Sequence, residues 1–300
     1  MKESPFRTIR KFNRGMLQSD REVIDQFVVR GPELDIALGV LRGNVNARSC
    51  QHVLVVAPHG RGKTMLLARV AGELRTESAL SKRLLLVRLT EDSREISELA
   101  DLWLESLYQL AREVGQGDPA LRRNLRATHA SLSPRWREQA FDEHALVALL
   151  EAADRLDRQL VLMVENLEAL CKRHDEDFGW KLRRVLQLEP KIILLSSATR
   201  RFKGLDNADQ PFFEFFRTID LPPLDTGECR RLGQAASGNA VSRREAKPLE
   251  ILTGGSPRLI AMMAFHARHR AASQLEELLA MLIDGHNEYF RSHIEALPNT

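Results

Sequence analysis

The stretch from Val53 to Leu67 reads VLVVAPHGRGKTMLL. Its first four residues form a continuous apolar run, which is typical of a parallel strand buried on both faces. A loop with two glycines follows, and an amphipathic helix pattern begins at Lys63. Glycine lets such a loop curl until backbone N–H groups point inward, and the helix N-terminus adds partial positive charge. The stretch therefore has the features of a phosphate-binding loop.

The pattern G-x-x-x-x-G-K-T of a P-loop fits Ala57–Thr64, with alanine in place of the first glycine. Lys63 is expected to reach the β- and γ-phosphates, and Thr64 to place its hydroxyl on Mg²⁺. The strand before the loop and the helix after it supply the context that this motif requires. The predicted nucleotide contacts in this stretch are Ala57, Pro58, His59, Gly60, Arg61, Gly62, Lys63, Thr64 and Met65.

A second buried strand is predicted at Leu160–Val164, and it ends in Glu165 and Asn166. An apolar run followed by an acid is the Walker B pattern, whose usual ending is Asp-Glu: the first acid serves the metal and the second polarises water. Glu165 is predicted to bind Mg²⁺ together with Thr64. Asn166 cannot accept a proton, although it can orient a water. Either hydrolysis is slow, or Glu165 or Glu168 acts as the base.

The remaining periodicities predict an α/β fold, because strand-like runs alternate with helical patterns. Further apolar runs lie at 84–87, 192–195 and, more weakly, 218–221, and helical periods follow Lys63 and cover 97–114 and 142–156. The strand signal ends at Pro222-Pro223. Residues 226–297 read as helices punctuated by Gly233, Gly238, Gly254-Gly255 and Pro257, with an amphipathic tail at 271–297.

Composition excludes several classes of protein. The 300 residues are 43% hydrophobic and 28% charged, and the net charge of +3 is too small for a dedicated polycation. No apolar run approaches the roughly 18 residues of a membrane helix, and the N-terminus lacks the apolar region of a secretory signal. Cys50, Cys171 and Cys229 lie far apart, which argues against a disulfide framework or a thiol zinc site. We expect a cytoplasmic protein without a membrane partner.

The segment from Gly115 to Gln139 breaks the alternation and is rich in arginine. One interpretation is a face for the phosphates of double-stranded DNA, centred on Arg122, Arg123 and Arg126. The other is a solvated helical insertion whose charges keep it soluble. The second interpretation is the favoured one.

Four further residues carry polar groups in informative places. The predicted fourth strand ends in Ser197 and Thr199, which are expected between the P-loop and Walker B strands. Arg217 comes immediately before the predicted fifth strand, where it either reaches a neighbouring subunit's nucleotide or remains a surface arginine. Arg258 opens a helix in the C-terminal segment, where a cation is able to report phosphate occupancy.

Together these residues resemble the AAA+ ATPases, specifically the bacterial branch similar to origin-recognition and initiator ATPases, close to the STAND ATPases. Phe27–Leu34 resembles the motif whose backbone contacts adenine, with Arg30 and Gly31 as the expected contacts. Thr199, with Ser197 as a near alternative, falls at the sensor 1 position. Arg217 resembles the arginine finger, and Arg258 matches sensor 2.

The resemblance implies a three-layer αβα core with a five-stranded parallel sheet in the order 5-1-4-3-2, followed by an all-α lid domain. It implies a helical lead-in at 1–28, an ATPase core at 29–222 and a lid at 223–300. It also implies a homo-oligomer that assembles with nucleotide. Relatives continue past the lid into a winged helix, and 289–298 resembles the start of such an extension.

Two functions are consistent with these residues. The first is Mg²⁺-dependent ATP hydrolysis that drives conformational change or assembly, with DNA as one partner. The second is a nucleotide-gated switch that binds ATP or ADP without hydrolysis and signals to a partner. The set of arginines favours the first and Asn166 favours the second. We expect an ATPase with slow turnover; its biological process, whether transcription, replication, transposition or defence, stays open.

Overall fold

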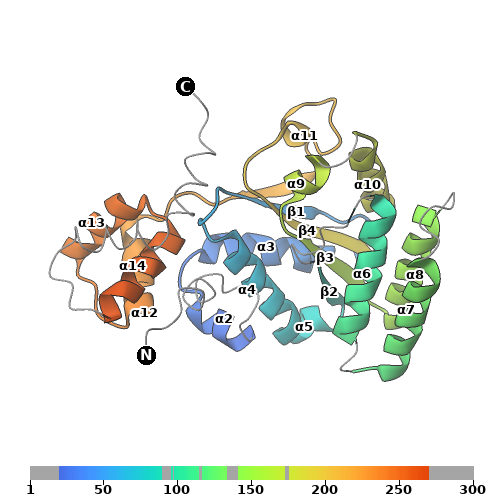
Figure 1. The fold of residues 1–300 in the computed structure, drawn as a ribbon, viewed down its shortest axis with the longest axis horizontal. Helices are drawn as coiled ribbons and strands as arrows, with labels where there is room; N and C mark the ends of the chain where they lie inside the picture. Colours follow the sequence, from blue (N-terminus) through green and yellow to red (C-terminus); the bar gives the residue numbers. More distant parts are fainter. Residues whose placement is uncertain are drawn as a thin grey trace. The chain divides into compact units, whose positions relative to one another are not determined.

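A parallel sheet with helices on both faces forms the centre of the fold (Figure 1). The computed structural model describes residues 20–89, 96, 98–114, 117–133, 141–172 and 176–269. The strands are β1 His52–Val56, β2 Leu84–Leu89, β3 Gln159–Val164, β4 Ile192–Ala198 and β5 Phe216–Asp220. The helices are α2 Asp20–Gln26, α3 Gly31–Asn44, α4 Lys63–Thr76, α5 Ser78–Ser81, α6 Leu99–Val114, α7 Pro119–Leu132, α8 Phe141–Leu156, α9 Leu167–Lys172, α10 Glu176–Leu188, α11 Lys203–Asp206, α12 Thr226–Ser237, α13 Arg243–Thr253 and α14 Pro257–His269.

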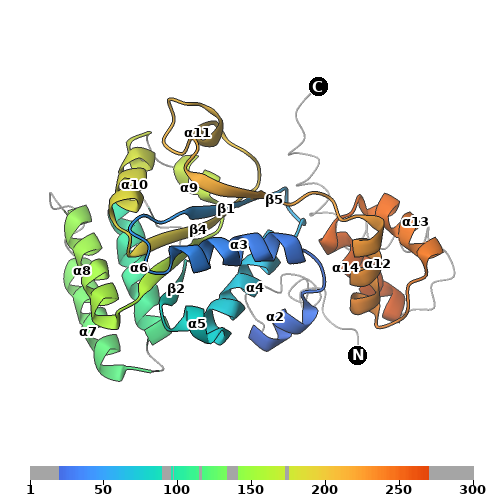
Figure 2. The same cartoon turned by 180° about the vertical axis from the view of Figure 1, so that it is seen from behind.

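The strand order β2-β3-β4-β1-β5 confirms the predicted order of the sheet, read from its other edge. Every pairing between neighbouring strands is parallel. The three central strands β1, β3 and β4 are buried at every residue, which explains their continuous apolar runs. Figure 1 shows α6 in front of the sheet, and Figure 2, seen from behind, shows α3 on the opposite face. The α/β fold class is therefore confirmed.

The chain divides into two compact units. One contains Pro32–Ala57 and Val70–Asp220, and therefore the whole sheet with α5 to α11. The other combines Pro58–Arg69, which includes the glycine loop, with the described residues up to Gly31 and from Leu221 onward. The domain boundaries predicted at residues 28 and 222 remain predictions.

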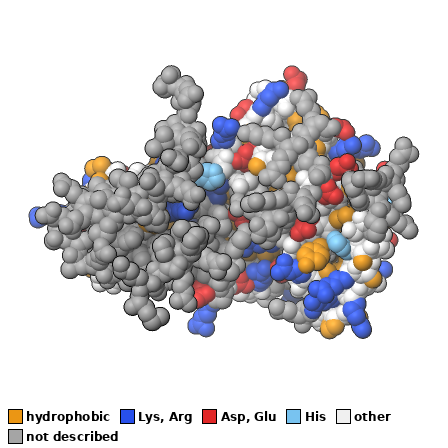
Figure 3. All heavy atoms as spheres, viewed as in Figure 1, with side chains coloured by type: hydrophobic (Ala, Val, Ile, Leu, Met, Phe, Trp, Pro, Cys, Tyr) orange, Lys and Arg blue, Asp and Glu red, His pale blue; other side chains and the backbone are white. Residues whose placement is uncertain are grey.

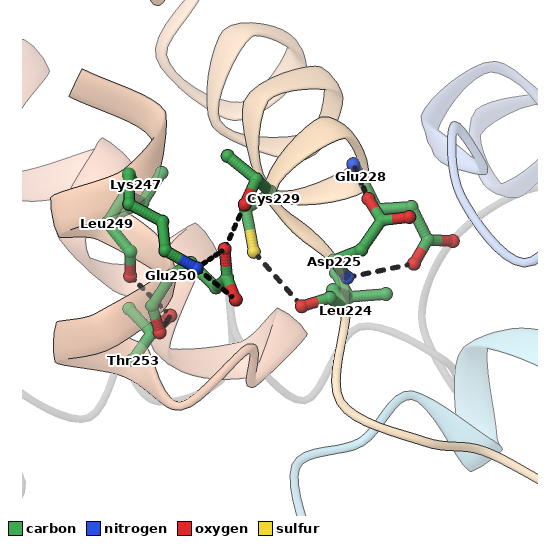
Figure 4. Close-up of polar contacts among 9 residues, drawn as sticks. Leu224, Asp225, Glu228, Cys229, Lys247, Leu249, Glu250 and Thr253 are labelled. Carbon is green, nitrogen blue, oxygen red and sulfur yellow. Dashed lines mark hydrogen bonds and ion pairs between the residues drawn. The ribbon is translucent and has the colours of Figure 1, made fainter. Parts of the chain in front are cut away.

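Three helices, α12 to α14, follow the sheet and form the predicted all-α lid. Leu224, Cys229 and Ile260 are buried together at its centre, and Val29 packs against them. Asp225 and Ser242 each complete a capping box, at the starts of α12 and α13. Figure 4 shows Asp225 beside Glu228 on α12, and Lys247 bonded to Glu250 on α13.

Glycine does not interrupt the lid helices everywhere that the sequence predicts. Gly238 and Gly254 do end α12 and α13, in the left-handed conformation that suits glycine. Gly233, however, lies inside α12 and is buried. A Cβ atom at Gly233 would lie 3.0 Å from Leu249 Cδ2 of α13, so this glycine allows the two helices to approach closely.

The arginine-rich segment folds in part as α7, between α6 and α8 of the sheet unit. Asp118 caps the helix by accepting hydrogen bonds from the N–H groups of Ala120 and Leu121. Leu125 is buried in the same core cluster as α6, so α7 is a packed helix. Residues 115, 116 and 134–139 of this segment lie outside the described residues, as does the predicted tail at 271–297. Among the described helices, none has both the length and the apolar character to cross a bilayer.

Candidate nucleotide site

The carboxyl ends of β1, β3 and β4 meet at one edge of the sheet. The Ala57 N–H, just after β1, donates to the Ala198 carbonyl of β4 at 3.1 Å. The Ser196 hydroxyl of β4 donates to the Val164 carbonyl at the end of β3, at 2.6 Å. In parallel sheets, ligands bind in the crevice beyond the carboxyl ends of the strands. The predicted position of Ser197 and Thr199, between the P-loop strand and the Walker B strand, agrees with this strand order.

The glycine loop follows Ala57 directly. Gly60 and Gly62 have φ angles of 79° and 98°, a region that side chains other than glycine rarely adopt. Lys63 opens α4 and is only 8% exposed. Its Nζ atom donates to the Pro58 carbonyl at 3.1 Å, so the lysine folds back over the loop. A curled backbone and a retained cation fit a phosphate group.

The loop is bonded to the start of α14 in the lid. Both the Arg258 N–H and the Ser256 hydroxyl donate to the Gly60 carbonyl, each at 3.3 Å. Arg61 Nη1 donates to the Gly254 carbonyl at 2.7 Å. The contact brings Arg258, predicted as sensor 2, next to the predicted phosphate loop. The sequence gives no sign of the Ser256 contact except that this serine precedes Pro257 at a helix start.

Arg30 connects the segment before the core to the lid. It has a φ of 72° and is 3% exposed, and its guanidinium donates to the Pro222 carbonyl. Gly31, the other predicted adenine contact, begins α3 and is exposed. Arg30 is thus fixed at Pro222, the point where the chain enters the lid.

Glu165, the predicted Walker B acid, has an arginine partner that no local sequence pattern indicates. Glu165 Oε1 lies 3.2 Å from Arg88 Nη2, and the two side chains are 8% and 19% exposed. Arg88 belongs to β2, the neighbour of β3 in the sheet. Its only sequence signal is its position as a charged residue within an apolar strand. The ion pair thus joins the end of β3 to the neighbouring strand β2.

Asn166 and the residues after it form a tight turn. Asn166 has a φ of 58°, a left-handed conformation that asparagine tolerates better than glutamate does. Its N–H donates to the Ser197 hydroxyl at 3.3 Å. Thr199 is held by Glu168, whose Oε1 accepts from both the Thr199 N–H, at 2.6 Å, and the Thr199 hydroxyl. The two candidate sensor residues thus have different partners, Asn166 for Ser197 and Glu168 of α9 for Thr199.

The other predicted residues lie in three settings. Thr64 and Met65 are half-buried in the first turn of α4, whereas Pro58 and His59 are exposed. Arg217 lies within β5 and not before it, paired with Val53 of β1. It is exposed at the amino end of the strand, away from the carboxyl edge. The structure brings Arg258 to the glycine loop, and brings Glu165, Asn166, Ser197 and Thr199 to the carboxyl edge of the sheet.

Solved structures of other proteins have a similar fold. The ORC2 protein of Aeropyrum pernix, solved as ADPNP-ADP complexes, has a TM-score of 0.57 and 16% identity, covering 90% of this chain and 71% of that one. The Aeropyrum pernix ORC1 protein in complex with DNA has a TM-score of 0.56 and 15% identity, covering 90% and 68%. PCH-2 of C. elegans has a TM-score of 0.52 and 10% identity, covering 90% and 72%.

No protein-family model matches the sequence, and comparison with curated proteins finds no match. The structural likeness and the strand order establish the fold class: this chain has the AAA+ ATPase fold that the sequence resemblance implies.

Proposed function

We propose that this chain binds ATP with Mg²⁺ and hydrolyses it slowly, and that the nucleotide state sets its conformation and assembly. The observation that carries the proposal is the glycine loop after β1. Its two glycines have positive φ, and Lys63 is folded over it. An origin-recognition protein with a similar fold was solved with ADPNP and ADP. That protein supports nucleotide binding here.

The predicted residues have distinct roles in this proposal, and Ser197 or Thr199 orients the attacking water. The loop residues from Ala57 to Met65 bind the phosphates, and the segment at Arg30 and Gly31 binds adenine. Thr64 and Glu165 would hold Mg²⁺, which prefers oxygen ligands and supplies charge neutralisation on the phosphates. The Arg258 side chain couples the bound phosphates to the lid; the hydrogen bond from its backbone N–H to the Gly60 carbonyl keeps residue 258 beside the loop.

A nucleotide-held switch is the second candidate. The observation that favours it is Asn166, because an amide cannot take the proton of the attacking water. In this case ATP or ADP stays bound, and the lid reports nucleotide occupancy to a partner. Phosphate release separates this candidate from the first.

The test measures ATP affinity and phosphate release with Mg-ATP for the wild type and Lys63→Ala. We expect the variant to lose at least about tenfold in ATP affinity, because a charge-assisted contact to phosphate is removed. Lys181→Ala is the matched control, since Lys181 forms an exposed ion pair with Asp177 on α10. Unchanged ATP affinity in Lys63→Ala would contradict both candidates. Firm binding by the wild type without phosphate release would select the switch.

Assembly is the third part of the proposal. Arg217 is exposed on β5, where it is available to a second copy of the chain. We propose that it completes a neighbour's nucleotide site. Sedimentation of the same samples with and without ATP tests this: growth of the particle with ATP, absent in Arg217→Ala, is the expected result. A monomer under every nucleotide condition would contradict it.

Double-stranded DNA is the proposed macromolecular partner, through α7. The helix carries Arg122, Arg123 and Arg126 and has no acidic residue. Tyr108 of α6 is 40% exposed, and its ring lies 5.6 Å from that of His129. Figure 3 shows basic side chains beside apolar ones over this part of the molecule. The ORC1 protein that shares the fold was solved with DNA, which supports this class of partner.

A further inference from the structure

The glycine loop provides a cap for α14 in the lid. Ser256 precedes Pro257, the first residue of α14, and its hydroxyl accepts from the Leu259 N–H at 3.5 Å, as an N-cap side chain does. The Arg258 N–H belongs to the first turn, where an N–H has no acceptor within the helix, and it donates to the Gly60 carbonyl at 3.3 Å. The loop thus supplies an acceptor that α14 itself lacks.

The Ser256 hydroxyl joins the helix cap to the loop. Its oxygen accepts from Leu259, and its hydrogen is donated to the same Gly60 carbonyl, at 3.3 Å. Ser256 is 6% exposed, so these bonds lie out of solvent. The loop and α14 belong to the same compact unit, and the Gly60 carbonyl therefore receives two hydrogen bonds from the start of α14.

The turn that carries Ser256 is itself held on two sides. On one side, Arg61 Nη1 donates to the Gly254 carbonyl at 2.7 Å. On the other side, the Gly255 carbonyl accepts from the Leu224 N–H at 2.9 Å. The turn is therefore a fixed support for the bonds that it makes to the glycine loop.

These bonds fix the plane of one peptide in the loop. In a trans peptide the C=O and the following N–H point in opposite directions, and no described peptide bond is cis. Because the Gly60 carbonyl is bonded to the start of α14, the Arg61 N–H is directed away from that helix. Glycine permits the neighbouring peptide plane to rotate, and Gly60 has a φ of 79°. The hydrogen bonds from Ser256 and Arg258 oppose that rotation.

We propose that Ser256 is a positioning residue for nucleotide binding: it orients the glycine loop for phosphate without contacting the nucleotide. The inference rests on the proposed binding of nucleotide at this loop. A loop whose peptides are already oriented loses less conformational freedom when a phosphate binds, so its affinity is higher. The coupling is reciprocal, and a nucleotide that orders the loop also stabilises the first turn of α14.

Ser242 separates this role from that of a helix cap. It caps α13 as Ser256 caps α14, and its cap bonds join it to Glu245 of the same helix. Replacing either serine with alanine removes a cap from a lid helix, at a similar cost in stability. Of the two serines, Ser256 is the one whose hydroxyl also bonds to the glycine loop.

The experiment measures the affinity of the full chain for Mg-ADP, which is not consumed, in the wild type, Ser256→Ala, Ser256→Thr and Ser242→Ala. We expect Ser256→Ala to bind about fivefold more weakly, because one neutral hydrogen bond that orients the loop is lost. Ser256→Thr keeps the hydroxyl and is expected to stay within about twofold of the wild type. Ser242→Ala is expected to keep the wild-type affinity although it loses a helix cap.

Hydrogen exchange of the wild type tests the reciprocal effect. Saturating Mg-ADP is expected to slow the exchange of the Arg258 and Leu259 N–H groups at the start of α14. This measurement decides if Ser256→Ala does not fold, because it needs no variant. Unchanged exchange of both groups would overturn the inference.

The outcomes separate this inference from the proposed function. Wild-type affinity in Ser256→Ala, or equal weakening in Ser256→Ala and Ser242→Ala, would overturn the role of Ser256 and leave nucleotide binding standing. A threonine variant as weak as the alanine variant would also overturn that role. A wild type that binds neither Mg-ADP nor Mg-ATP would overturn the proposed function and this inference together.

Discussion

At the scale of single residues, His52 links pH to the stability of the sheet. It is 1% exposed at the start of β1, and its Nδ1 accepts from the Leu194 N–H at 3.1 Å. Nε2 lies 3.2 Å from the Leu186 carbonyl, so the ring bridges β4 and α10 as the neutral tautomer. Burial lowers the pKa of His52 to about 4 from its ordinary 6.5.

The sign of the pH effect follows from this lowered pKa. Between pH 6.5 and 4, His52 is protonated in the unfolded chain but stays neutral in the folded chain. The contribution of neutral His52 to the free energy of unfolding is therefore complete above pH 6.5 and is lost as the pH falls toward 4. The slope is up to about 1.4 kcal/mol per pH unit. We predict that the difference in the free energy of unfolding between the wild type and His52→Gln, measured with urea, becomes smaller as the pH falls from 8 to 4.5. A constant difference between the two proteins would contradict the prediction.

At the scale of elements, the turn between α13 and α14 packs against the backbone at the start of the lid. Gly254 and Gly255 have φ angles of 54° and 62°. A Cβ atom at Gly255 would lie 2.5 Å from the Leu224 oxygen and 2.7 Å from its nitrogen, whereas one at Gly254 would meet nothing within 4 Å. The Leu224 N–H donates to the Gly255 carbonyl at 2.9 Å, so two backbone segments touch here.

We predict that Gly254→Ala and Gly255→Ala differ strongly although both place alanine at a positive φ. The first variant costs about 1–2 kcal/mol for the backbone conformation alone. The second adds a collision with the Leu224 backbone, which has no room to move without opening the core of the lid. Hydrogen exchange in α12 to α14 measures the difference, and equal protection in the two variants would refute it.

The elements themselves were largely predictable, but their contacts were not. All five strands appear where the apolar runs lie, with shifts of at most three residues at the ends. β4 continues to Ala198 because Ser196 satisfies its hydroxyl on the Val164 carbonyl, so a buried serine does not end the strand. The strand order came from the family resemblance, since apolar runs carry no information about neighbours.

The candidate site was predictable only where residues are adjacent in the chain. The glycine loop and Glu165 follow from local patterns. The Arg88–Glu165 ion pair and the bonds from the lid to Gly60 join residues distant in the sequence. Such pairings depend on the folded backbone, and no local spacing encodes them. Gly233 shows the converse case, in which a helix-breaking residue is retained for close packing.

At the scale of the whole molecule, we predict from the arginines of α7 that the protein binds DNA in a salt-dependent way. Arg123 and Arg126 are exposed and Arg122 is half-buried on the same helix. Replacing all three by glutamine removes about three phosphate contacts, so the slope of log affinity against log salt falls by about 3 units. Fluorescence anisotropy with a double-stranded oligonucleotide measures this slope.

The matched control replaces three arginines outside α7, namely Arg155, Arg158 and Arg184, by glutamine. The net charge changes equally in the two triple variants, so a nonspecific attraction would weaken equally. A wild-type slope in the α7 variant, or no binding by the wild type at low salt, would exclude α7 as the interface.

The two outermost strands of the sheet differ from the inner three in one respect. β2 and β5 each carry an arginine, Arg88 and Arg217, whereas β1, β3 and β4 contain no lysine, arginine, aspartate or glutamate. An outermost strand exposes backbone groups that can recruit strands from other molecules, and a charge on it opposes such growth. We therefore predict that Arg217→Val, which removes the exposed charge near the start of β5, makes the protein more prone to aggregate, as light scattering would show.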